Sequence, residues 1–476
     1  MKGRFRGIER IHFVGIGGIG MCGLAELLRA QGYTVTGSDL AEGATVARLR
    51  ALGVPVAIGH DSRHVGQADV VVVSSAIRAN NPELVEASLR GIPVIPRAEM
   101  LAEVMRLKDG IAIAGTHGKT TTTSLVAHVL QAAGLDPTIV VGGRVIGAGA
   151  EGDRTGAGEE GERTGARLGG GPFLVAEADE SDGSFLHLSP VIAVVTNVEA
   201  EHLDHHGSVE ALEDAFAAFL ARLPFWGTAV LCLDDPGVQR LLARVSRRRI
   251  TYGLLAQADW VASEVTTDGP GMAFAVRKQE HALGHVRLPL AGRHNVANAL
   301  AALAVADELA VPFAVAAEAL ATFRGVERRF ETKGVVAGIR VVDDYAHHPT
   351  ELRATLAAAR GLHAGRIVVV FQPHRHTRTR DFFDAFTTAF HDADLLVLTE
   401  IYGAGEPKLP GVEAAVLADA IRARGHRDVR FVADLERVVP ELLPELESGD
   451  LVLTLGAGSV SRLGPRLLQA LVETRP

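Results

Sequence analysis

Short apolar runs alternate with amphipathic stretches along most of the chain, a pattern typical of strands that alternate with helices. Near the start, segments typical of strands cover residues 11–14, 34–39 and 68–74, and a helical stretch extends to Ala30 between the first two. Strands in such an order form a parallel sheet covered by helices, and ligands then bind at the carboxyl ends of the strands. The first part of the chain is therefore predicted to be an α/β unit.

The same alternation returns in two later parts of the chain. Further apolar runs lie at residues 111–114, 173–176 and 191–195, and then at 338–342, 366–371, 395–399 and 451–455. A chain of 476 residues is too long for one hydrophobic core. Because charged residues near Lys108 and a turn at Gly325 separate the parts, we predict three α/β domains, at residues 1–107, 108–325 and 326–476.

One stretch of the second part, residues 151–171, breaks the pattern. It is rich in glycine and nearly devoid of large apolar side chains. Such a composition cannot bury enough surface to order itself, so we expect a mobile surface loop there.

The composition narrows the class of protein. The chain carries 48 basic and 57 acidic residues, a net charge of −9, which argues against a general nucleic-acid surface. Its two cysteines, Cys22 and Cys232, imply no disulfide framework. We find neither a leader-like segment nor an apolar stretch of about 18 residues. We expect a soluble cytoplasmic protein, a monomer or homodimer, that binds neither nucleic acid nor membrane.

The most informative motif is GTHGKTTTTS, which starts at Gly115 directly after an apolar run and leads into a helical pattern. Glycines let backbone N–H groups surround phosphate oxygens, and the helix presents its positive end to them. Lys119 is expected to reach the β- and γ-phosphates, and Thr120 to offer its hydroxyl to Mg²⁺. The predicted nucleotide loop consists of Gly115, Thr116, His117, Gly118, Lys119, Thr120 and Thr121. We therefore expect the chain to consume ATP.

Two acidic strings follow the next predicted strands of this part. Glu177 ends one strand in AEADESD, and His202 follows the other beside several acids. A carboxylate at the carboxyl end of this sheet is where Mg²⁺ needs a hard oxygen ligand, although a solvated acidic loop is the alternative. For His202, a second metal contact and a structural role are equally open from spacing alone.

An earlier glycine cluster resembles a dinucleotide fingerprint. It consists of Gly15, Gly17, Gly18 and Gly20, and Asp39 follows at the end of the next strand. A diphosphate is expected at the N-terminus of the following helix. NAD-dependent redox chemistry is the rival interpretation, but because an ATP loop exists elsewhere, we favour a UDP-sugar.

Three other strings carry candidate chemistry. Asn295 and Asn298 share a helix face, which suits recognition of a base, although a cap and a polar face explain them equally well. Residues 342–350 and 371–380 each end a strand with histidines and charged residues. Because carboxyl ends of parallel strands meet at one edge, we expect one shared site there.

Together, the strings resemble those of the Mur ligases, in that family's order from Ile11 to Thr379. They are IHFVGIGGIGM, GTHGKTTTTS, AEADESD, GRHNVANA, GVERRF, DDYAHHPTE and FQPHRHTRT. The resemblance implies a Rossmann-like UDP-sugar-binding domain, a central P-loop ATPase domain and a Rossmann-like C-terminal domain that brings the amino acid. It points to the members that join L-alanine to UDP-N-acetylmuramate in peptidoglycan precursor synthesis.

The reaction that this resemblance implies has two steps. The lactyl carboxylate of the sugar nucleotide attacks the γ-phosphate of ATP to form an acyl phosphate, and the amine of L-alanine then displaces phosphate. Two anions must meet in the first step. Lys119 and Mg²⁺ are therefore expected to cancel their repulsion.

Motif matching also implies roles for individual residues. The expected catalytic residues are Lys119, Glu177, His202, Arg329 and His348, and the expected metal ligands are Thr120, Glu177 and His202. The nucleotide is expected to contact Asn295, Asn298 and Asp344. The UDP-sugar site is matched by Gly15, Gly17, Gly18, Gly20, Asp39, Ser74 and Ser75, and His374 and Arg375 match the approach of the amino acid.

Departures from the family pattern and rival functions stay open at this point. Glu201 replaces an aspartate, His376 replaces an aromatic residue, and residues 151–171 have no assigned counterpart. The nearest rivals are the later-adding ligases and the ligase that recycles murein peptides. A dehydrogenase leaves GTHGKT unexplained, and a nucleotide-binding regulator has no need of Glu177 and His202 together. The strictness for alanine over serine or glycine is not predicted.

Overall fold

The computed structural model describes residues 5–74, 76–141 and 166–474, and these form two compact units. The first unit holds most of the chain up to Phe323, and the second holds most of the chain from Arg324 on. Each unit is described below by itself. The three predicted domain boundaries stay predictions.

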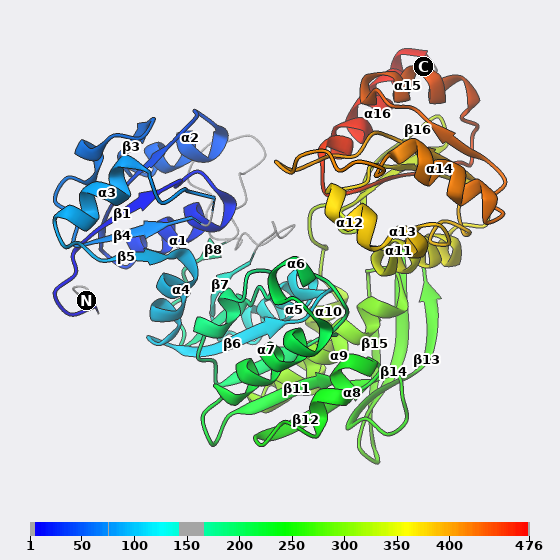
Figure 1. Cartoon of the computed structure of the whole chain (residues 1–476). Helices are drawn as coiled ribbons and strands as arrows, with labels where there is room; N and C mark the ends of the chain where they lie inside the picture. The colour runs from blue at the N-terminus through cyan, green and yellow to red at the C-terminus, as the bar shows by residue number, and fades with distance from the viewer. Residues whose placement is uncertain (1–4, 75, 142–165, 475–476) are drawn as a thin grey trace. The chain divides into compact units, whose positions relative to one another are not determined.

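Five parallel strands form the first sheet, in the order β3-β2-β1-β4-β5 (Figure 1). The strands are β1 (Arg10–Val14), β2 (Thr34–Asp39), β3 (Val56–Ile58), β4 (Val70–Val73) and β5 (Val94–Pro96). The strand order reverses between β1 and β4, and sheets of this kind bind ligands at the carboxyl ends of the strands beside such a reversal.

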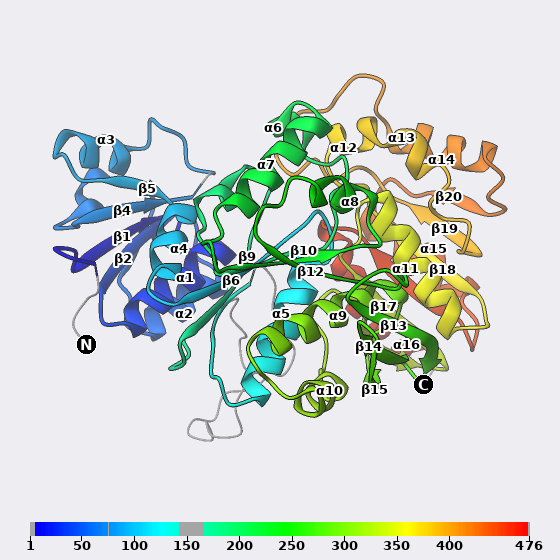
Figure 2. The same cartoon turned by 90° about the horizontal axis from the view of Figure 1, so that it is seen from below.

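Helices cover both faces of this sheet, as Figure 2 shows. One face packs against α1 (Ile19–Ala30), α2 (Ala44–Ala51) and α4 (Arg97–Met105). The other face packs against the short 3₁₀ helix η1 (Ser62–Val65) and α3 (Pro82–Leu89). The arrangement is the doubly covered parallel sheet that the alternating pattern predicts.

The second sheet has β6 (Asp109–Ala114) between β9 (Phe173–Glu177) and β10 (Ile192–Val195), all parallel. The helix α5 (Lys119–Ala132) starts four residues after β6 ends. The loops after the three strands therefore meet at one edge, which brings the predicted nucleotide loop beside both predicted acidic strings.

The other elements of this part extend the sheet or cover it. The strands are β7 (Thr138–Val140), β8 (Ala166–Arg167), β11 (Thr228–Cys232) and β12 (Arg248–Gly253), followed by β13 (Trp260–Asp268), β14 (Gly271–Lys278) and β15 (His281–Leu288). The helices are η2 (Ser184–His187), α6 (Leu203–His206), α7 (Val209–Ala221), α8 (Pro236–Leu242), α9 (Arg293–Glu308) and α10 (Phe313–Ala321). The strands β13 to β15 were not predicted, because half-exposed strands lack the continuous apolar runs used to find the others.

The prediction of a mobile loop over residues 151–171 is wrong for the part that the structure describes. Ala166 and Arg167 pair with β7 in an antiparallel ladder. Lys108 then donates to the carbonyl oxygens of Gly169 and Gly171, both at 2.7 Å. Backbone pairing and one lysine thus order a segment that has few apolar side chains. Residues 151–165 of the predicted loop lie outside the described residues.

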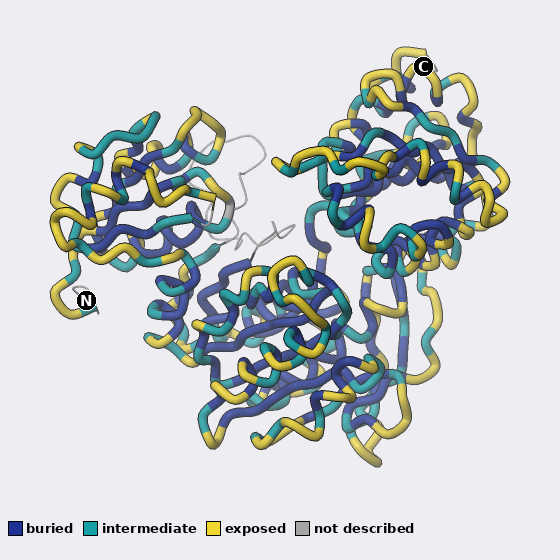
Figure 3. Tube along the Cα trace, viewed as in Figure 1, coloured by how far each residue is buried: buried dark blue, intermediate teal, exposed yellow. Residues whose placement is uncertain are grey.

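Six strands form the third sheet, in the order β16-β17-β21-β18-β19-β20, with β16 antiparallel at the edge. They are β16 (Glu331–Val336), β17 (Ile339–Asp344), β18 (Ile367–Phe371), β19 (Leu395–Leu398), β20 (Val429–Phe431) and β21 (Leu451–Leu455). Every residue of β18, β19 and β21 is buried, and Figure 3 shows these strands in dark blue. Burial on both faces explains their continuous apolar runs.

Helices cover both faces of the third sheet as well. One face packs against α11 (Pro349–Leu362), α13 (Phe383–Phe386) and α14 (Ala414–Ala423). The other packs against α15 (Leu435–Leu442) and α16 (Leu463–Thr474). The short helix α12 (His376–Asp381) follows β18.

Several helices start at short polar side chains that satisfy their first backbone N–H groups. Asn81, Ser208 and Asp235 each accept such a hydrogen bond at the start of α3, α7 and α8. Among the described residues, none of the helices combines the length and the apolar composition needed to cross a membrane.

Candidate active site

Glycine is required at two positions of the loop that follows β6. Gly115 and Gly118 have φ angles of +131° and +81°. A Cβ atom at Gly115 would lie 2.1 Å from Thr196 Oγ1, and one at Gly118 would lie 2.9 Å from Asn298 Oδ1. Positive φ and close neighbours both exclude a larger residue. The second contact also places the predicted Asn298 beside the loop.

The loop is held in place by the residues that follow β10. Asn197 accepts from the His117 N–H at 2.7 Å and donates to the His117 carbonyl at 3.0 Å. The hydroxyl of Thr196 donates to the same carbonyl at 2.6 Å, and Thr116 Oγ1 accepts from the Glu199 N–H at 2.9 Å. Asn197 and Thr196 were not predicted to belong to the site, because only the pairing of β6 with β10 brings them there.

Lys119 is surrounded by carboxylates. Its ammonium group lies 2.8 Å from Glu180 Oε2, and Glu180 is 1% exposed. Burial raises the pKa of Glu180 to about 7 although Lys119 opposes the shift. Burial lowers the pKa of Lys119, but Glu180, Asp179 and Glu177 outweigh it, so the net shift is upward and Lys119 is charged.

Thr120 and Glu177 form the second pair of the loop. The Thr120 hydroxyl donates to Glu177, whose two oxygens lie at 3.1 and 3.2 Å. A hydroxyl on the first turn of α5 and a carboxylate at the end of β9 offer hard oxygen atoms at one point, which is the donor set that Mg²⁺ prefers. These two predicted metal ligands are thus brought together.

His202 stands at the start of α6 with a φ angle of +56°. This left-handed conformation is uncommon for a residue other than glycine, and it concentrates at functional positions. Burial raises the pKa of nearby Asp179, but Lys119 and His202 contribute to a net lowering. His202 therefore lies within electrostatic reach of the acidic string that follows β9.

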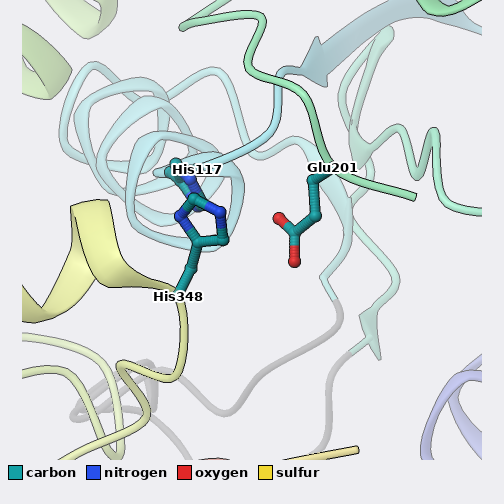
Figure 4. Close-up of side chains that lie close together, drawn as sticks. All are labelled: His117, Glu201 and His348. Atoms are coloured by element: carbon teal, nitrogen blue, oxygen red, sulfur yellow. The ribbon is translucent and has the colours of Figure 1, made fainter. Parts of the chain in front are cut away.

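Figure 4 shows two further side chains of the same edge, His117 from the glycine loop and Glu201 from the segment after β10. Glu201 is 5% exposed, so the longer side chain that departs from the family pattern is buried. His348, drawn with them, belongs to the second unit and is described there. Thr121, the last residue of the predicted loop, is buried on the first turn of α5.

The first glycine loop follows β1, at the point where the strand order reverses toward β4. The Gly17 N–H donates to Asp39 Oδ2 at 2.7 Å. A Cβ atom at Gly15 would lie 3.5 Å from the Cβ of Ser74, so the loops after β1 and β4 are adjacent. A Cβ atom at Gly20 would lie 3.0 Å from a guanidinium nitrogen of Arg97, a cation that was not predicted. Ser75 lies outside the described residues.

A cluster of buried polar side chains is linked to the same loop by hydrogen bonds. Glu83 is fully buried and accepts from Ser38, and it pairs with His12 at 2.6 Å and His60 at 2.7 Å. The Ser38 carbonyl in turn accepts from the N–H groups of Gly15 and Ile16. Glu83 lies far from its partners in the sequence, so no local sequence pattern could have predicted this cluster.

Asn295 and Asn298 both lie in the first turns of α9, as predicted, and both are buried, at 8% and 7% exposure. The side-chain amide of Asn295 donates to the Ala291 carbonyl at 2.7 Å. This hydrogen bond connects the start of the helix to the turn before it.

In the second unit, Asp344 ends β17 and binds backbone. Its two oxygens accept from the N–H groups of Phe330 and Ala346, both at 2.7 Å. Burial raises the pKa of Asp344 to about 6, although Arg329 and these hydrogen bonds oppose the shift. Arg329 lies 5.2 Å from the ring centre of Tyr345, where a cation is stabilised by the aromatic face.

His348 caps the start of α11. Its Nδ1 accepts from the Thr350 N–H at 3.3 Å, and Glu351 accepts from the His348 N–H at 3.2 Å. This reciprocal cap gives His348 a structural role that the sequence reasoning did not include. Its ring packs edge-on against Phe382, with centres 4.4 Å apart.

His374 and Arg375 follow β18. The His374 ring stacks on Tyr402 at 5.6 Å, and burial, with the neighbouring His347, lowers the pKa of His374 to about 3. His374 is therefore neutral at physiological pH. Arg375 has a φ angle of +69° and donates its N–H to the Tyr402 carbonyl at 2.8 Å. His376, the departure from the family pattern, is 4% exposed.

Comparison with known proteins identifies the family. Three family models match: "Mur ligase family, catalytic domain" over residues 10–109, "Mur ligase middle domain" over residues 113–306 and "Mur ligase, glutamate ligase domain" over residues 328–458. A relative from Sorangium cellulosum (strain So ce56), named UDP-N-acetylmuramate–L-alanine ligase, is 56% identical over 96% of this chain and 95% of its own length. The chain belongs to the Mur ligase family.

Two solved structures extend the comparison. A UDP-N-acetylmuramate-alanine ligase from Thermotoga maritima is 30% identical, with a TM-score of 0.80 over 98% of this chain and 100% of that chain. A murein peptide ligase from Psychrobacter arcticus is 27% identical, with a TM-score of 0.70 over 98% and 99%. The predicted family, the three-part α/β fold class and the enzyme class, a ligase, are confirmed.

Proposed function

We propose that this chain joins L-alanine to UDP-N-acetylmuramate with the consumption of ATP, as a step of peptidoglycan precursor synthesis. The relative that shares more than half of its residues over nearly the whole chain supports this function. The main structural support is that Lys119, Thr120 and Glu177 lie together at the glycine loop that follows β6, the strand between β9 and β10.

The residues of this loop fit Mg²⁺ and ATP. Thr120 and Glu177 would hold the cation, with His202 as a further ligand, and Lys119 would hold the β- and γ-phosphates. Bound there, Mg²⁺ would neutralise charge on the transferred phosphoryl group. The loop N–H groups and the start of α5 add fixed positive dipoles.

We assign the remaining nucleotide contacts as the family strings imply. Asn295 and Asn298 contact the nucleotide, Asp344 and His348 contribute to its binding, and Arg329 stabilises the reacting phosphate. The exposure of Arg329 supports this role, because 31% of its side chain is accessible where it lies over the ring of Tyr345.

The first glycine loop binds the UDP-sugar in this proposal. The diphosphate is held at the start of α1 by Gly15, Gly17, Gly18 and Gly20. Asp39 and Ser74 lie beside this loop, and Ser75 follows Ser74 in the sequence. Arg97, the first residue of α4, adds a positive charge beside Gly20 on the first turn of α1, where the diphosphate would bind in this proposal.

His374 and Arg375 take the amino acid. Arg375 offers a guanidinium for the carboxylate of L-alanine. His374, neutral because of its low pKa, offers a ring nitrogen without adding charge that would repel the ammonium form of the amino acid.

A coupled assay of ADP release tests the proposal. The purified chain is given ATP, Mg²⁺ and UDP-N-acetylmuramate together with L-alanine, L-serine, glycine or a murein peptide. We expect ADP release with L-alanine. Release with the murein peptide alone would reassign the chain to the recycling ligases, and no release with any acceptor would contradict ligation.

A further inference from the structure

Lys119 has its hydrogen-bonding capacity fully used by protein oxygens. Its ammonium group donates to the carbonyls of Gly115 at 2.7 Å and Thr116 at 3.2 Å. The two oxygens of Glu180 lie at 2.9 and 2.8 Å and share the third donor. A lysine has three N–H donors, so a phosphate oxygen can bind Lys119 only by displacing one of these partners.

Glu180 is the partner that can be exchanged. The two carbonyl groups belong to the loop whose shape Asn197 and the glycines hold, whereas Glu180 contributes a side chain with rotatable bonds. Keeping Glu180 charged also costs free energy. Its side chain is 1% exposed, and a single lysine faces the negative charges of Glu180, Asp179 and Glu177.

We infer that Glu180 competes with nucleotide phosphates for Lys119 and thereby sets the affinity of the glycine loop for ATP. The inference rests on the proposed function in one respect, that this loop binds ATP. Glu180 acts through Lys119 and is a positioning residue. The carboxylate keeps the buried lysine charged and oriented, and the phosphates replace it as the counter-charge.

The test is the substitution Glu180→Gln, which keeps the size of the side chain and removes its charge. We expect the Kd of Mg²⁺-ADP, measured by isothermal titration calorimetry, to fall about tenfold, since charge-assisted hydrogen bonds are roughly twice as strong as neutral ones. The KM for ATP should fall in parallel, while kcat and the KM for UDP-N-acetylmuramate stay within about twofold. A residue that served folding alone would not separate these constants in this way.

Asp182→Asn is the matched control, because Asp182 is an exposed acid of the same segment that accepts from the Ser184 N–H at 3.0 Å. We expect its Kd for Mg²⁺-ADP to equal that of the unchanged chain. An equal gain in both variants would mean a general effect of charge and would overturn the inference, as would an unchanged or weaker affinity in Glu180→Gln.

Two further variants keep the test decisive. If Glu180→Gln does not fold, Glu180→Asp retracts the carboxylate from Lys119, and its Kd should also fall; an unchanged value overturns the inference. Lys119→Ala separates this inference from the proposed function. Unchanged ADP binding in Lys119→Ala contradicts the phosphate loop itself, whereas weakened binding there with no gain in Glu180→Gln contradicts Glu180 alone.

Discussion

The two glycine loops of the first unit share a backbone design and differ in their charges. Each follows a central strand of a parallel sheet and leads into a helix, α1 in one case and α5 in the other. In the first loop a backbone N–H donates to Asp39, and Arg97 lies close by. In the second, Lys119 stands among three carboxylates and Thr120 contacts Glu177. The backbone supplies an anion site in both, and the side chains distinguish a loop suited to binding from one suited to phosphoryl transfer.

Both loops hold a glycine at positive φ, Gly15 at +80° in the first loop, but the glycines directly before the two helices differ in how strictly glycine is required. Gly18 has an ordinary φ of −62°, and a Cβ atom there would meet its nearest neighbour at 3.6 Å. Gly118 has a φ of +81° and would meet Asn298 at 2.9 Å. Glycine is therefore replaceable directly before α1 and required directly before α5.

The largest expected effect is on turnover. Lys119→Ala should lower kcat/KM at least about a hundredfold, because a charge placed to stabilise the transferred phosphoryl group is lost. The affinity for UDP-N-acetylmuramate, measured by calorimetry, should not change, because the first loop is the site proposed for it. Lys278→Ala, an exposed lysine paired with Asp307, is the control. An equal loss of sugar-nucleotide binding would contradict the division of roles between the loops.

A smaller effect should appear in the dependence of stability on pH. Burial raises the pKa of Glu180 from 4.5 to about 7. The folded state then holds a proton that the unfolded state releases, so the free energy of unfolding should fall as pH rises through this window, by at most about 3 kcal/mol. Urea unfolding between about pH 5 and pH 8 measures this, and the fall should be shallower in Glu180→Gln. An identical slope in that variant would show that Glu180 does not carry the effect.

The positive charge of Arg97, beside the first glycine loop, should contribute only to the binding of the nucleotide. Arg97→Met should raise the Kd of UDP about tenfold and that of UMP less, because the guanidinium interacts with the diphosphate. Arg106→Met is the control, since Arg106 lies just after the same helix and pairs with Glu103. Equal losses for UDP and UMP would place Arg97 away from the diphosphate.

The smallest effect concerns the backbones of the loops. Gly118→Ala should lower the free energy of unfolding by about 1 to 2 kcal/mol, because a left-handed conformation is strained for alanine. Gly18→Ala should stay within about 0.5 kcal/mol, as for substitutions without strain. Urea unfolding of both variants measures the difference, and equal losses would remove the contrast between the loops.

Much of the fold could be predicted from local patterns. The strand β2 matches its predicted span, and β9, β10, β18 and β21 lie where apolar runs mark them. Parallel strands buried on both faces read as continuous apolar runs, so their positions are encoded locally. The half-exposed strands β13 to β15 and the short β3, β5 and β20 lack this signal and were missed. The strand β11 is buried throughout and was missed as well, so burial alone did not make every strand visible in the sequence. Ala166 and Arg167 join a sheet through backbone pairing, which amino-acid composition does not reveal.

The sequence by itself determined the two glycine loops, the residues that end the buried strands and the family to which the chain belongs, because each depends on residue types at short and regular spacing. Only the tertiary structure decided that β6 lies between β9 and β10. That order, and not any local pattern, brings Glu180 onto Lys119 across 61 residues and Asn197 onto His117 across 80. In the same way, the packing of α4 beside α1 brings Arg97 to Gly20. Contacts between distant residues depend on strand order and helix packing, which follow from the burial of the whole chain and leave no signature in the neighbouring residues.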